Sequence, residues 1–326
     1  MNTTPSSSSS SSSSAAPRVG ATTTSDGDSN TRALVLAGAG AAGNAWQLGL
    51  IAGLADAGVD VTVADLIIGT SAGSTVAAQI TSGTRPAELY AAILAEVPPP
   101  RAGAGSGSGS GSDRARTGQL SGPAYMDWSN EIIGAADGAA DMRRRIAAAA
   151  LEKDASDGSG TNRWRDIVAA RLPSRHWPKQ PVLIPALDAR TGEPVVFDRH
   201  SGIDLVDAVA ASTSALTPYR IGERRYLNGG YRRSSNADLA AGYGRVLVLE
   251  PFGGRSRTPL EWGLDLATQV DELRAGGSRV ETVFPDAGAG DVFNANALDP
   301  STRLPAARGG YDQGQALAER LSTFWK

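Results

Sequence analysis

The chain has 326 residues, of which 31 are Lys or Arg and 34 are Asp or Glu, so its formal net charge is −3. With 41% hydrophobic and 20% charged residues, it has the composition of a globular protein rather than of a collagen-like, wholly disordered or strongly basic nucleic-acid-binding chain. The absence of cysteine excludes disulfides and Cys-ligated metal sites, and two histidines, His176 and His200, are too few for a His-rich metal site.

No run of eighteen apolar residues predicts a membrane-spanning helix, and the first residues have neither the basic start nor the apolar stretch of a secretory signal. We therefore expect a cytoplasmic location. Residues 1–30 include nine consecutive serines and almost no large apolar side chain, so they predict a disordered tail. The remaining residues, 31–326, predict one large domain. Within it, Gly-Ser repeats predict a flexible loop over 98–116, and the Ala-rich stretch at about 117–175 predicts a helical insertion.

Apolar runs bounded by glycine and polar residues predict strands, and apolar residues at helical spacing predict helices. In chain order we expect strand 33–37, helix 44–57, strand 64–68, helix 72–82, a helix from Pro86, strands 181–187 and 194–197, helix 203–212, strands near 225–227 and at 245–249, helix 260–275, strand 279–284 and helix 306–324. Strands and helices alternate at both ends of the domain. The sequence therefore predicts an α/β fold, a three-layer αβα sandwich with a mostly parallel central sheet and a helical insertion.

Two glycine-rich segments each follow a predicted strand and precede a predicted helix. The first is Gly38-Ala39-Gly40-Ala41-Ala42-Gly43. Its backbone N–H groups can point at an anion, so it fits either a dinucleotide-binding turn or an oxyanion hole, which binds the alkoxide of a tetrahedral intermediate. A tight turn that merely needs glycine is the third interpretation.

The second segment is Gly69-Thr70-Ser71-Ala72-Gly73. A sharp turn there exposes the Ser71 hydroxyl at a helix N-terminus, with glycines where a Cβ atom would collide. A dinucleotide-binding unit would instead place an acidic residue at the end of the second strand, about 20 positions beyond its glycines. Asp60 and Asp65 are near that distance, but Asp65 lies at the start of the strand and Ser71 follows its end. This arrangement favours a serine nucleophile with an oxyanion hole.

A third motif, Tyr226-Leu227-Asn228-Gly229-Gly230, follows the segment Ala211-Ser212-Thr213-Ser214-Ala215-Leu216-Thr217-Pro218. With these motifs in this order, the chain resembles the patatin-like phospholipases from about residue 32 to at least residue 250. Members of that family combine a glycine-rich oxyanion loop, a Gly-x-Ser-x-Gly elbow and an Asp-Gly-Gly or Asp-Gly-Ala motif, and they use a Ser–Asp dyad without histidine. The resemblance implies hydrolysis of lipid or phospholipid esters without a cofactor or metal. It also implies peripheral contact with a membrane, whereas the expectation of no nucleic-acid partner rests on the composition and charge.

Carried over residue by residue, the resemblance makes Ser71 the nucleophile, in an elbow flanked by Gly69 and Gly73. It assigns the oxyanion hole to Gly38, Ala39, Gly40, Ala41 and Gly43, and the third motif to Gly229 and Gly230. Ala39 replaces a frequent glycine, and Ala42 a frequent arginine. The position of the catalytic aspartate falls on Asn228. A neutral amide is too weak a base to take the serine proton near pH 7, so we expect impaired catalysis.

Other residues offer three alternatives to the missing aspartate. The acids Asp207, Glu223 and Asp238 lie nearby in the sequence, and His200 could complete a Ser-His-acid triad. The third alternative is deamidation of Asn228, because Asn-Gly pairs are prone to it. Two other functions also stay open: a lipid-binding pseudoenzyme that keeps the pocket without the base, and a nucleotide-binding protein that uses the first glycine-rich turn.

The helical insertion contains aromatic and basic residues that admit two interpretations. Trp128, Trp164 and Trp177 could form a lid or an acyl-chain groove, but core packing is the interpretation we favour. Arg143, Arg144 and Arg145 could meet phosphate head groups, but a solvated helix face explains them better. The insertion is therefore expected to support the fold.

Overall fold

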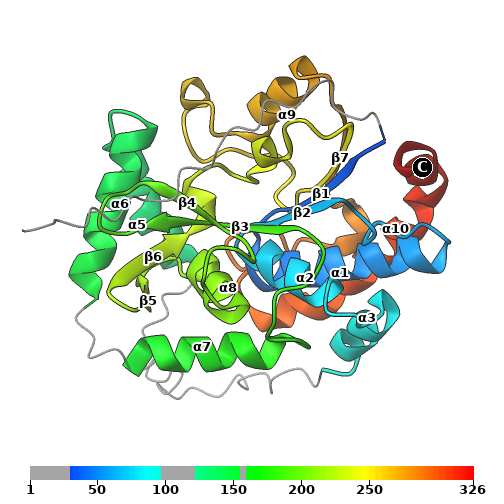
Figure 1. Ribbon diagram of the computed structural model, residues 1–326, viewed down its shortest axis with the longest axis horizontal. Helices are drawn as coiled ribbons and strands as arrows, with labels where there is room; N and C mark the ends of the chain where they lie inside the picture. Colours follow the sequence, from blue (N-terminus) through cyan, green and yellow to red (C-terminus); the bar gives the residue numbers. More distant parts are fainter. Residues whose placement is uncertain (1–29, 97–121, 155–158) are drawn as a thin grey trace, which may run out of the picture.

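The computed structural model describes residues 30–96, 122–154 and 159–326 (Figure 1). The predicted tail, apart from its last residue, and the predicted loop 98–116 lie outside these described residues. The first residues of the predicted insertion, 117–121, also lie outside them. The boundaries of the tail and of the loop therefore stay predictions.

The described strands form one eight-stranded sheet in the order β5-β6-β3-β2-β1-β7-β8, with β4 paired to β3. They are β1 (Arg32–Leu36), β2 (Leu66–Gly69), β3 (Val182–Asp188), β4 (Pro194–Phe197), β5 (Tyr219–Ile221), β6 (Arg224–Asn228), β7 (Arg245–Leu249) and β8 (Arg279–Val283). Neighbouring strands in the series β3-β2-β1-β7-β8 are parallel, whereas β4, β5 and β6 pair antiparallel at one end of the sheet. The parallel sheet centre agrees with the prediction.

Helices cover both faces of this sheet (Figure 1). One face carries α1 (Gly40–Asp56), α2 (Ala72–Ile80), α3 (Pro86–Leu94), α8 (Leu205–Thr213) and α10 (Arg303–Trp325), and the other carries α9 (Leu266–Ala275). In β1, Leu34 and Leu36 pack into the core with α1, whereas Ala33 and Val35 pack into the core with α9. Both faces of the strand are buried, which is why it is a continuous apolar run in the sequence. The prediction of a three-layer sandwich is confirmed.

Helices α1 and α10 lie in close contact beneath the sheet. A Cβ atom on Gly49 would lie 2.1 Å from the Ala307 carbonyl oxygen, and one on Gly310 would lie 2.3 Å from the Trp46 carbonyl oxygen. The fully buried Trp46 donates its Nε1–H to Gln313 Oε1 at 2.9 Å. These contacts fix α1, whose first turn belongs to the first glycine-rich segment.

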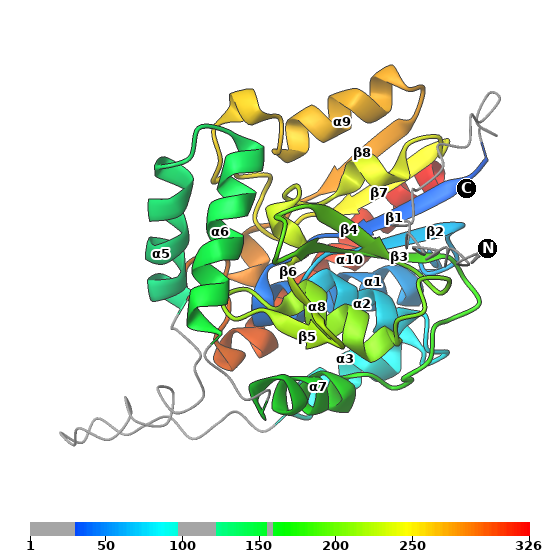
Figure 2. The same cartoon turned by 60° about the vertical axis from the view of Figure 1, so that its left-hand side comes forward.

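The described part of the insertion is helical, as predicted, and consists of α5 (Gly122–Gly134), α6 (Ala139–Lys153) and α7 (Ser159–Arg171). Helices α5 and α6 lie side by side at the end of the sheet near β6 (Figure 2). Ile133 of α5 and Ile146 of α6 share an apolar cluster with Leu227 of β6. Helix α7 packs against α8. The insertion thus covers the antiparallel end of the sheet.

Several element boundaries differ from the prediction. Helix α1 begins at Gly40, inside the glycine-rich segment, rather than at residue 44. The predicted helix 260–275 is interrupted: Leu260–Trp262 forms a 3-10 turn, and α9 begins after Asp265, whose side chain accepts a hydrogen bond from the Thr268 N–H. Strand β5 was not predicted because three residues are too few to establish an alternating pattern, and its pairing with β6 makes it a strand.

Candidate active site

Ser71 occupies the sharp turn between β2 and α2, with φ = 52° and ψ = −123°. A positive φ is rare for a residue other than glycine, and such strain persists where the surroundings enforce it. A Cβ atom on Gly73 would lie 2.0 Å from the Leu36 carbonyl oxygen, and one on Gly69 would lie 2.6 Å from the Gly73 carbonyl oxygen. The turn therefore needs glycine at both positions. It holds the half-buried Ser71 at the N-terminus of α2, where the helix dipole favours negative charge.

Asn228, at the end of β6, contacts Ser71 although 157 positions separate them in the sequence. Its Nδ2 donates a hydrogen bond to Ser71 Oγ at 2.9 Å. Its Oδ1 accepts the Gly230 N–H at 2.8 Å, and its backbone N–H donates to the Ser214 carbonyl oxygen at 2.7 Å. These three bonds fix both the position and the orientation of the amide.

The orientation of the Asn228 amide determines what it can do chemically. The Gly230 N–H needs an acceptor, so the amide oxygen faces Gly230 and the amide nitrogen faces Ser71. An amide nitrogen donates hydrogen bonds and cannot take a proton from the Ser71 hydroxyl. A carboxylate in the same place would keep the bond to Gly230 through one oxygen and turn the other toward Ser71. The geometry therefore places a neutral amide, rather than a group that can take a proton, against the Ser71 hydroxyl.

The first glycine-rich segment lies directly beside Ser71. A Cβ atom on Gly38 would lie 2.8 Å from Ser71 Cβ and 3.4 Å from Ser71 Oγ. In the described part of the chain, no backbone acceptor is bonded by the N–H groups of Gly38, Ala39, Gly40 and Ala41. These four donors lie at the N-terminus of α1, next to Ser71. Their arrangement suits the binding of an oxyanion.

The end of the same segment has a different role. The Ala42 N–H donates to the Ala297 carbonyl oxygen at 3.0 Å, and the Gly43 N–H donates to the Ala39 carbonyl oxygen at 2.9 Å. A Cβ atom on Gly43 would lie 2.5 Å from Ala39 Cβ. Gly43 therefore permits close packing of the first helical turn, and its N–H is already engaged.

Two polar side chains that the sequence analysis did not single out hold this site together. The fully buried Ser212 of α8 accepts the Ser71 N–H through its Oγ at 3.0 Å. Asn236, with φ = 57°, donates its Nδ2–H to Thr70 Oγ1 at 3.0 Å and to the Gly229 carbonyl oxygen at 3.1 Å. Asn236 thus joins the residue before Ser71 to the residue after Asn228. Only Ser212 had a signal in the sequence, its place in the Ala-Ser segment.

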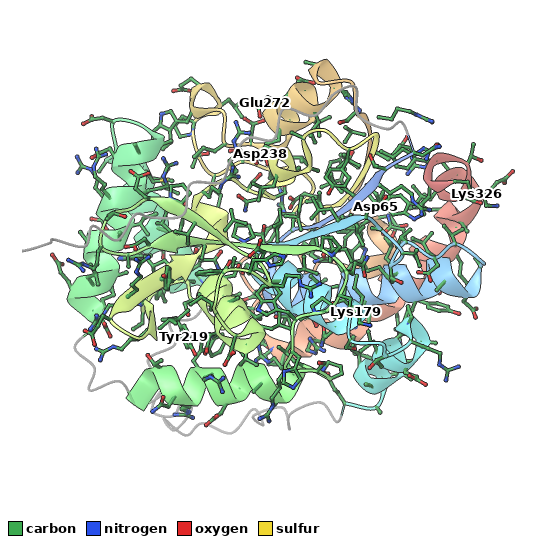
Figure 3. All side chains as sticks on the ribbon, viewed as in Figure 1. Asp65, Lys179, Tyr219, Asp238, Glu272 and Lys326 are labelled. Carbon is green, nitrogen blue, oxygen red and sulfur yellow. The ribbon has the colours of Figure 1, made fainter. Side chains whose placement is uncertain are left out.

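The nearby acids are engaged elsewhere in the structure. Asp207 accepts the Tyr219 hydroxyl at 2.5 Å and forms an ion pair with Arg165 at 2.8 Å. Asp238 forms an ion pair with Arg232 at 2.6 Å. Figure 3 shows Tyr219 and Asp238 on opposite sides of the sheet. These acids are partners of cations and hydroxyl groups of the fold, and the described contacts do not bring them to Ser71.

The remaining alternatives do not assemble at the site either. The side chains of Glu223 and His200 are exposed. Asp65 lies just before the start of β2 and accepts the Arg32 N–H at 2.8 Å. Ser71 follows the opposite end of that strand, so the acid that a dinucleotide-binding turn requires is at the wrong end.

The aromatic and basic residues of the insertion make structural contacts. Trp164 and Trp177 each donate their indole N–H to a backbone carbonyl, at 3.2 and 2.7 Å respectively. Trp128 packs against the apolar cluster of α5, α6 and β6. Arg144 and Arg145 form ion pairs with an aspartate one turn away on α6. These contacts agree with the packing interpretation of the tryptophans and with the helix-face interpretation of Arg144 and Arg145. Arg143 is instead half-buried, and its Nε has no hydrogen-bond partner among the described residues.

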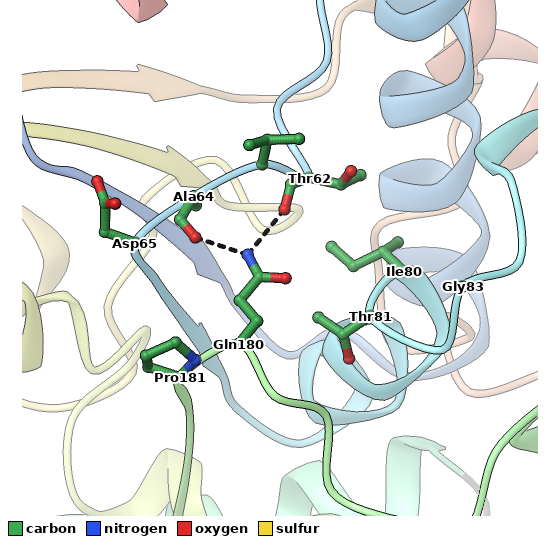
Figure 4. Close-up of a pocket in the computed structure, with 9 residues that line it drawn as sticks. Thr62, Ala64, Asp65, Ile80, Thr81, Gly83, Gln180 and Pro181 are labelled. Atoms are coloured by element: carbon green, nitrogen blue, oxygen red, sulfur yellow. Dashed lines mark hydrogen bonds between the residues drawn. The ribbon is translucent and has the colours of Figure 1, made fainter.

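A cavity of about 660 Å³ lies at the opposite end of β2 from Ser71 (Figure 4). Gln180 on its wall donates to the carbonyl oxygens of Thr62 and Ala64 at 2.8 and 2.7 Å. Neither Ser71 nor Asn228 lines this cavity. Among the described residues, no group of three or more His, Cys, Asp or Glu side chains could hold a metal ion.

Among families of known proteins, the sequence matches one. The sequence matches the family model described as patatin-like phospholipase over residues 34–241, which is more than half of the chain. None of the curated proteins matches it. Among solved structures, the chain is similar to VipD from Legionella pneumophila, with 14% identity, a TM-score of 0.41, and 89% of this chain and 67% of that chain covered. It is also similar to the type III effector protein ExoU, with 16% identity, a TM-score of 0.40, and 89% of this chain but 53% of that chain covered, so it spans about half of ExoU.

Proposed function

The chain belongs to the patatin-like phospholipase family, and from this we propose that it is a serine hydrolase for carboxylic esters of lipids. Ser71 is the proposed nucleophile, and Asn228 stands in the position of the dyad aspartate. The observation that carries this proposal is the 2.9 Å hydrogen bond between Asn228 Nδ2 and Ser71 Oγ at the strained turn before α2.

In the proposed reaction, Ser71 Oγ attacks the carbonyl carbon of the ester. The carbonyl oxygen becomes an alkoxide that the N–H groups of Gly38 to Ala41 stabilise. The alcohol then leaves with a proton, and the acyl group stays on Ser71 until water releases it as the free acid. The side chain at position 228 has to take the Ser71 proton, pass it to the leaving alcohol, and then take a proton from the attacking water.

Asn228 cannot perform these proton transfers, so we propose that the chain as it stands retains the nucleophile and the oxyanion site but has impaired turnover. General-base catalysis contributes about 10²- to 10⁴-fold to the rate of such reactions. Asn228→Asp is expected to raise the turnover by about this factor. The variant needs no rearrangement, because the Gly230 N–H donates to a carboxylate oxygen as readily as to an amide oxygen.

The test is the hydrolysis of p-nitrophenyl esters by the chain as it stands, Asn228→Asp, and Asn228→Asp combined with Ser71→Ala. The matched control is Asn130→Asp, which makes the same change at an exposed position whose side-chain oxygen accepts a bond from Arg257. We expect turnover in Asn228→Asp at least about 10²-fold above that of the other proteins. Ser71-dependent activity of the unaltered chain within about tenfold of that of Asn228→Asp would show that another base exists and that the assignment of position 228 is wrong.

Deamidation of Asn228 would produce aspartate or isoaspartate in aged samples, and only the aspartate carries the carboxylate of the dyad. Both polar atoms of the Asn228 side chain are hydrogen-bonded in the folded chain, which opposes the rotation that deamidation requires. Intact mass has to accompany each assay, because a gain of about 1 Da marks the conversion. Activity that rises with that mass fraction would support the dyad.

A lipid-binding pseudoenzyme is the second candidate, and the direction of the Asn228 bond favours it. The Asn228 amide donates to Ser71 Oγ and so holds the hydroxyl without activating it. The expected signature is binding of a lipid ester to the unaltered chain without turnover. Gain of turnover in Asn228→Asp would then show that the two candidates differ by this one side chain.

The proposed substrate class is a lipid ester, reached by peripheral contact with a membrane or micelle surface. In the described residues, no helix is both long and apolar enough to cross a membrane. The cytoplasmic location and the absence of a nucleic-acid partner stay predictions from the sequence.

A further inference from the structure

The side chain of Leu298 lies against the glycine-rich segment beside Ser71. A Cβ atom on Gly40 would lie 2.5 Å from Leu298 Cδ2 and 3.2 Å from Leu298 Cα, so the leucine covers Gly40 directly. Gly40 has φ = +56°, and its N–H is one of the four donors without a backbone acceptor in the described chain. Leu298 nevertheless keeps 50% of its surface exposed. A large apolar side chain is therefore available next to the oxyanion donors.

The segment that carries Leu298 is held firmly against α1. Ala297, which is 2% exposed, accepts the Ala42 N–H at 3.0 Å. The ring of Phe293 packs edge-to-face on Trp46, with 6.1 Å between the ring centroids. Arg255 donates to the Phe293 carbonyl oxygen at 2.6 Å. Leu298 is therefore presented from a fixed backbone, although it lies beyond the residues 34–241 that match the family.

We infer that Leu298 is a specificity-determining residue that contacts the acyl chain of the ester, an inference that rests on the function proposed above. The geometry of the oxyanion donors supplies the argument. When the carbonyl oxygen of the ester binds the N–H groups of Gly38 to Ala41, the first carbons of the acyl chain lie within a few bonds of the same loop. An apolar wall beside that loop stabilises a long acyl chain and contributes little to an acetyl group. Leu298 would therefore set how strongly the site prefers a longer acyl chain to an acetyl group within the proposed substrate class.

The test compares kcat/KM for p-nitrophenyl octanoate and p-nitrophenyl acetate in the Asn228→Asp background. We expect Leu298→Ala to lower the octanoate value about five- to tenfold while the acetate value changes less than about twofold. Leu298→Met keeps an apolar side chain of similar volume and is expected to retain the octanoate preference. Leu260→Ala is the matched control, because Leu260 is also exposed, at 67%, and lies in the turn before α9. An unchanged ratio of octanoate to acetate in Leu298→Ala would overturn the inference.

A second measurement separates this inference from the proposed function. If Asn228→Asp shows no turnover, the proposed hydrolysis fails, and binding of octanoic acid to the unaltered chain then tests Leu298 alone. Weaker binding to Leu298→Ala than to Leu260→Ala supports the acyl contact without catalysis. Equal binding by the two variants, or no binding to the unaltered chain, overturns it.

Discussion

Glu250 is a buried acid whose protonation should make the stability of the fold depend on pH. It follows β7 directly and is 4% exposed. Its Oε1 accepts the Phe252 N–H at 3.3 Å, whereas Oε2 has no hydrogen-bond partner in the described structure. Burial raises the pKa of the Glu250 carboxyl from 4.5 to about 7, and the bond from Phe252 opposes part of that rise.

The sign of the effect follows from this raised pKa. Because the folded chain binds the proton more tightly than the unfolded chain, the contribution to stability is complete below pH 4.5 and is lost as the pH rises through about 7. The difference between 4.5 and about 7 corresponds to roughly 3 kcal/mol of unfolding free energy, at about 1.4 kcal/mol for each pKa unit. Glu250→Gln is neutral at every pH and keeps an oxygen for the Phe252 N–H. The Glu250→Gln variant should therefore not lose this unfolding free energy as the pH rises.

The assay is equilibrium unfolding in urea at pH 4.5 and pH 8 for the unaltered chain, Glu250→Gln and the control Glu261→Gln, which replaces an exposed acid. The unfolding free energy of Glu250→Gln, relative to the unaltered chain, should rise by about 3 kcal/mol between the two pH values. Glu261→Gln should show no comparable change. If Glu250→Gln and the unaltered chain lose the same stability between pH 4.5 and pH 8, the reasoning from burial is refuted.

Two further substitutions test the packing and the site. Gly310→Ala should lower the unfolding free energy by about 3 kcal/mol in urea, because its methyl group meets the Trp46 carbonyl oxygen, whereas Gly160→Ala on α7 meets nothing within 4 Å and should be neutral or slightly stabilising. In the Asn228→Asp background, Ser212→Ala removes the acceptor of the Ser71 N–H and should lower kcat about tenfold. The control is Ser214→Ala, because the Ser214 hydroxyl donates to a helix carbonyl instead. Ser212→Ala should lower the thermal stability no more than Ser214→Ala does. Equal kcat values for these two serine variants would show that the bond to Ser71 has no role in turnover.

The sequence predicted the elements whose signal is local. β1 and β7 are short apolar runs within a residue of their predicted bounds, because both faces of these strands are buried. The start of α1 was missed because Gly40 and Ala41 carry no apolar periodicity, and the helix begins there through the contact of Ala42 with Ala297. β5 was missed because pairing with β6, rather than its own three residues, makes it a strand.

The same distinction applies to the site. Ser71 and its flanking glycines are recognisable in sequence because the elbow is a local motif in which each glycine avoids a specific collision. Ser212 lies 141 positions from Ser71, and Asn236 lies 166 positions from Thr70. Nothing in one sequence marks such pairs, because their contact depends on how β2, α8 and the segment after β6 meet in the fold. Leu298 could not be recognised from the sequence either, because its proposed role depends on its contact with Gly40 in the fold.

The arrangement around Ser71 also explains why one substitution can separate structure from turnover. The strained φ of Ser71, the glycines that admit the turn and the four N–H groups near Gly38 are held by contacts that do not involve a charge at position 228. Asn228 keeps the bond to Gly230 that an aspartate would make, and it keeps a bond to Ser71, but with the donor and acceptor reversed. The fold therefore tolerates either side chain, whereas proton transfer requires the carboxylate. Retention of the whole scaffold is consequently no evidence of activity, because in the proposed reaction the side chain at position 228 has to transfer the proton.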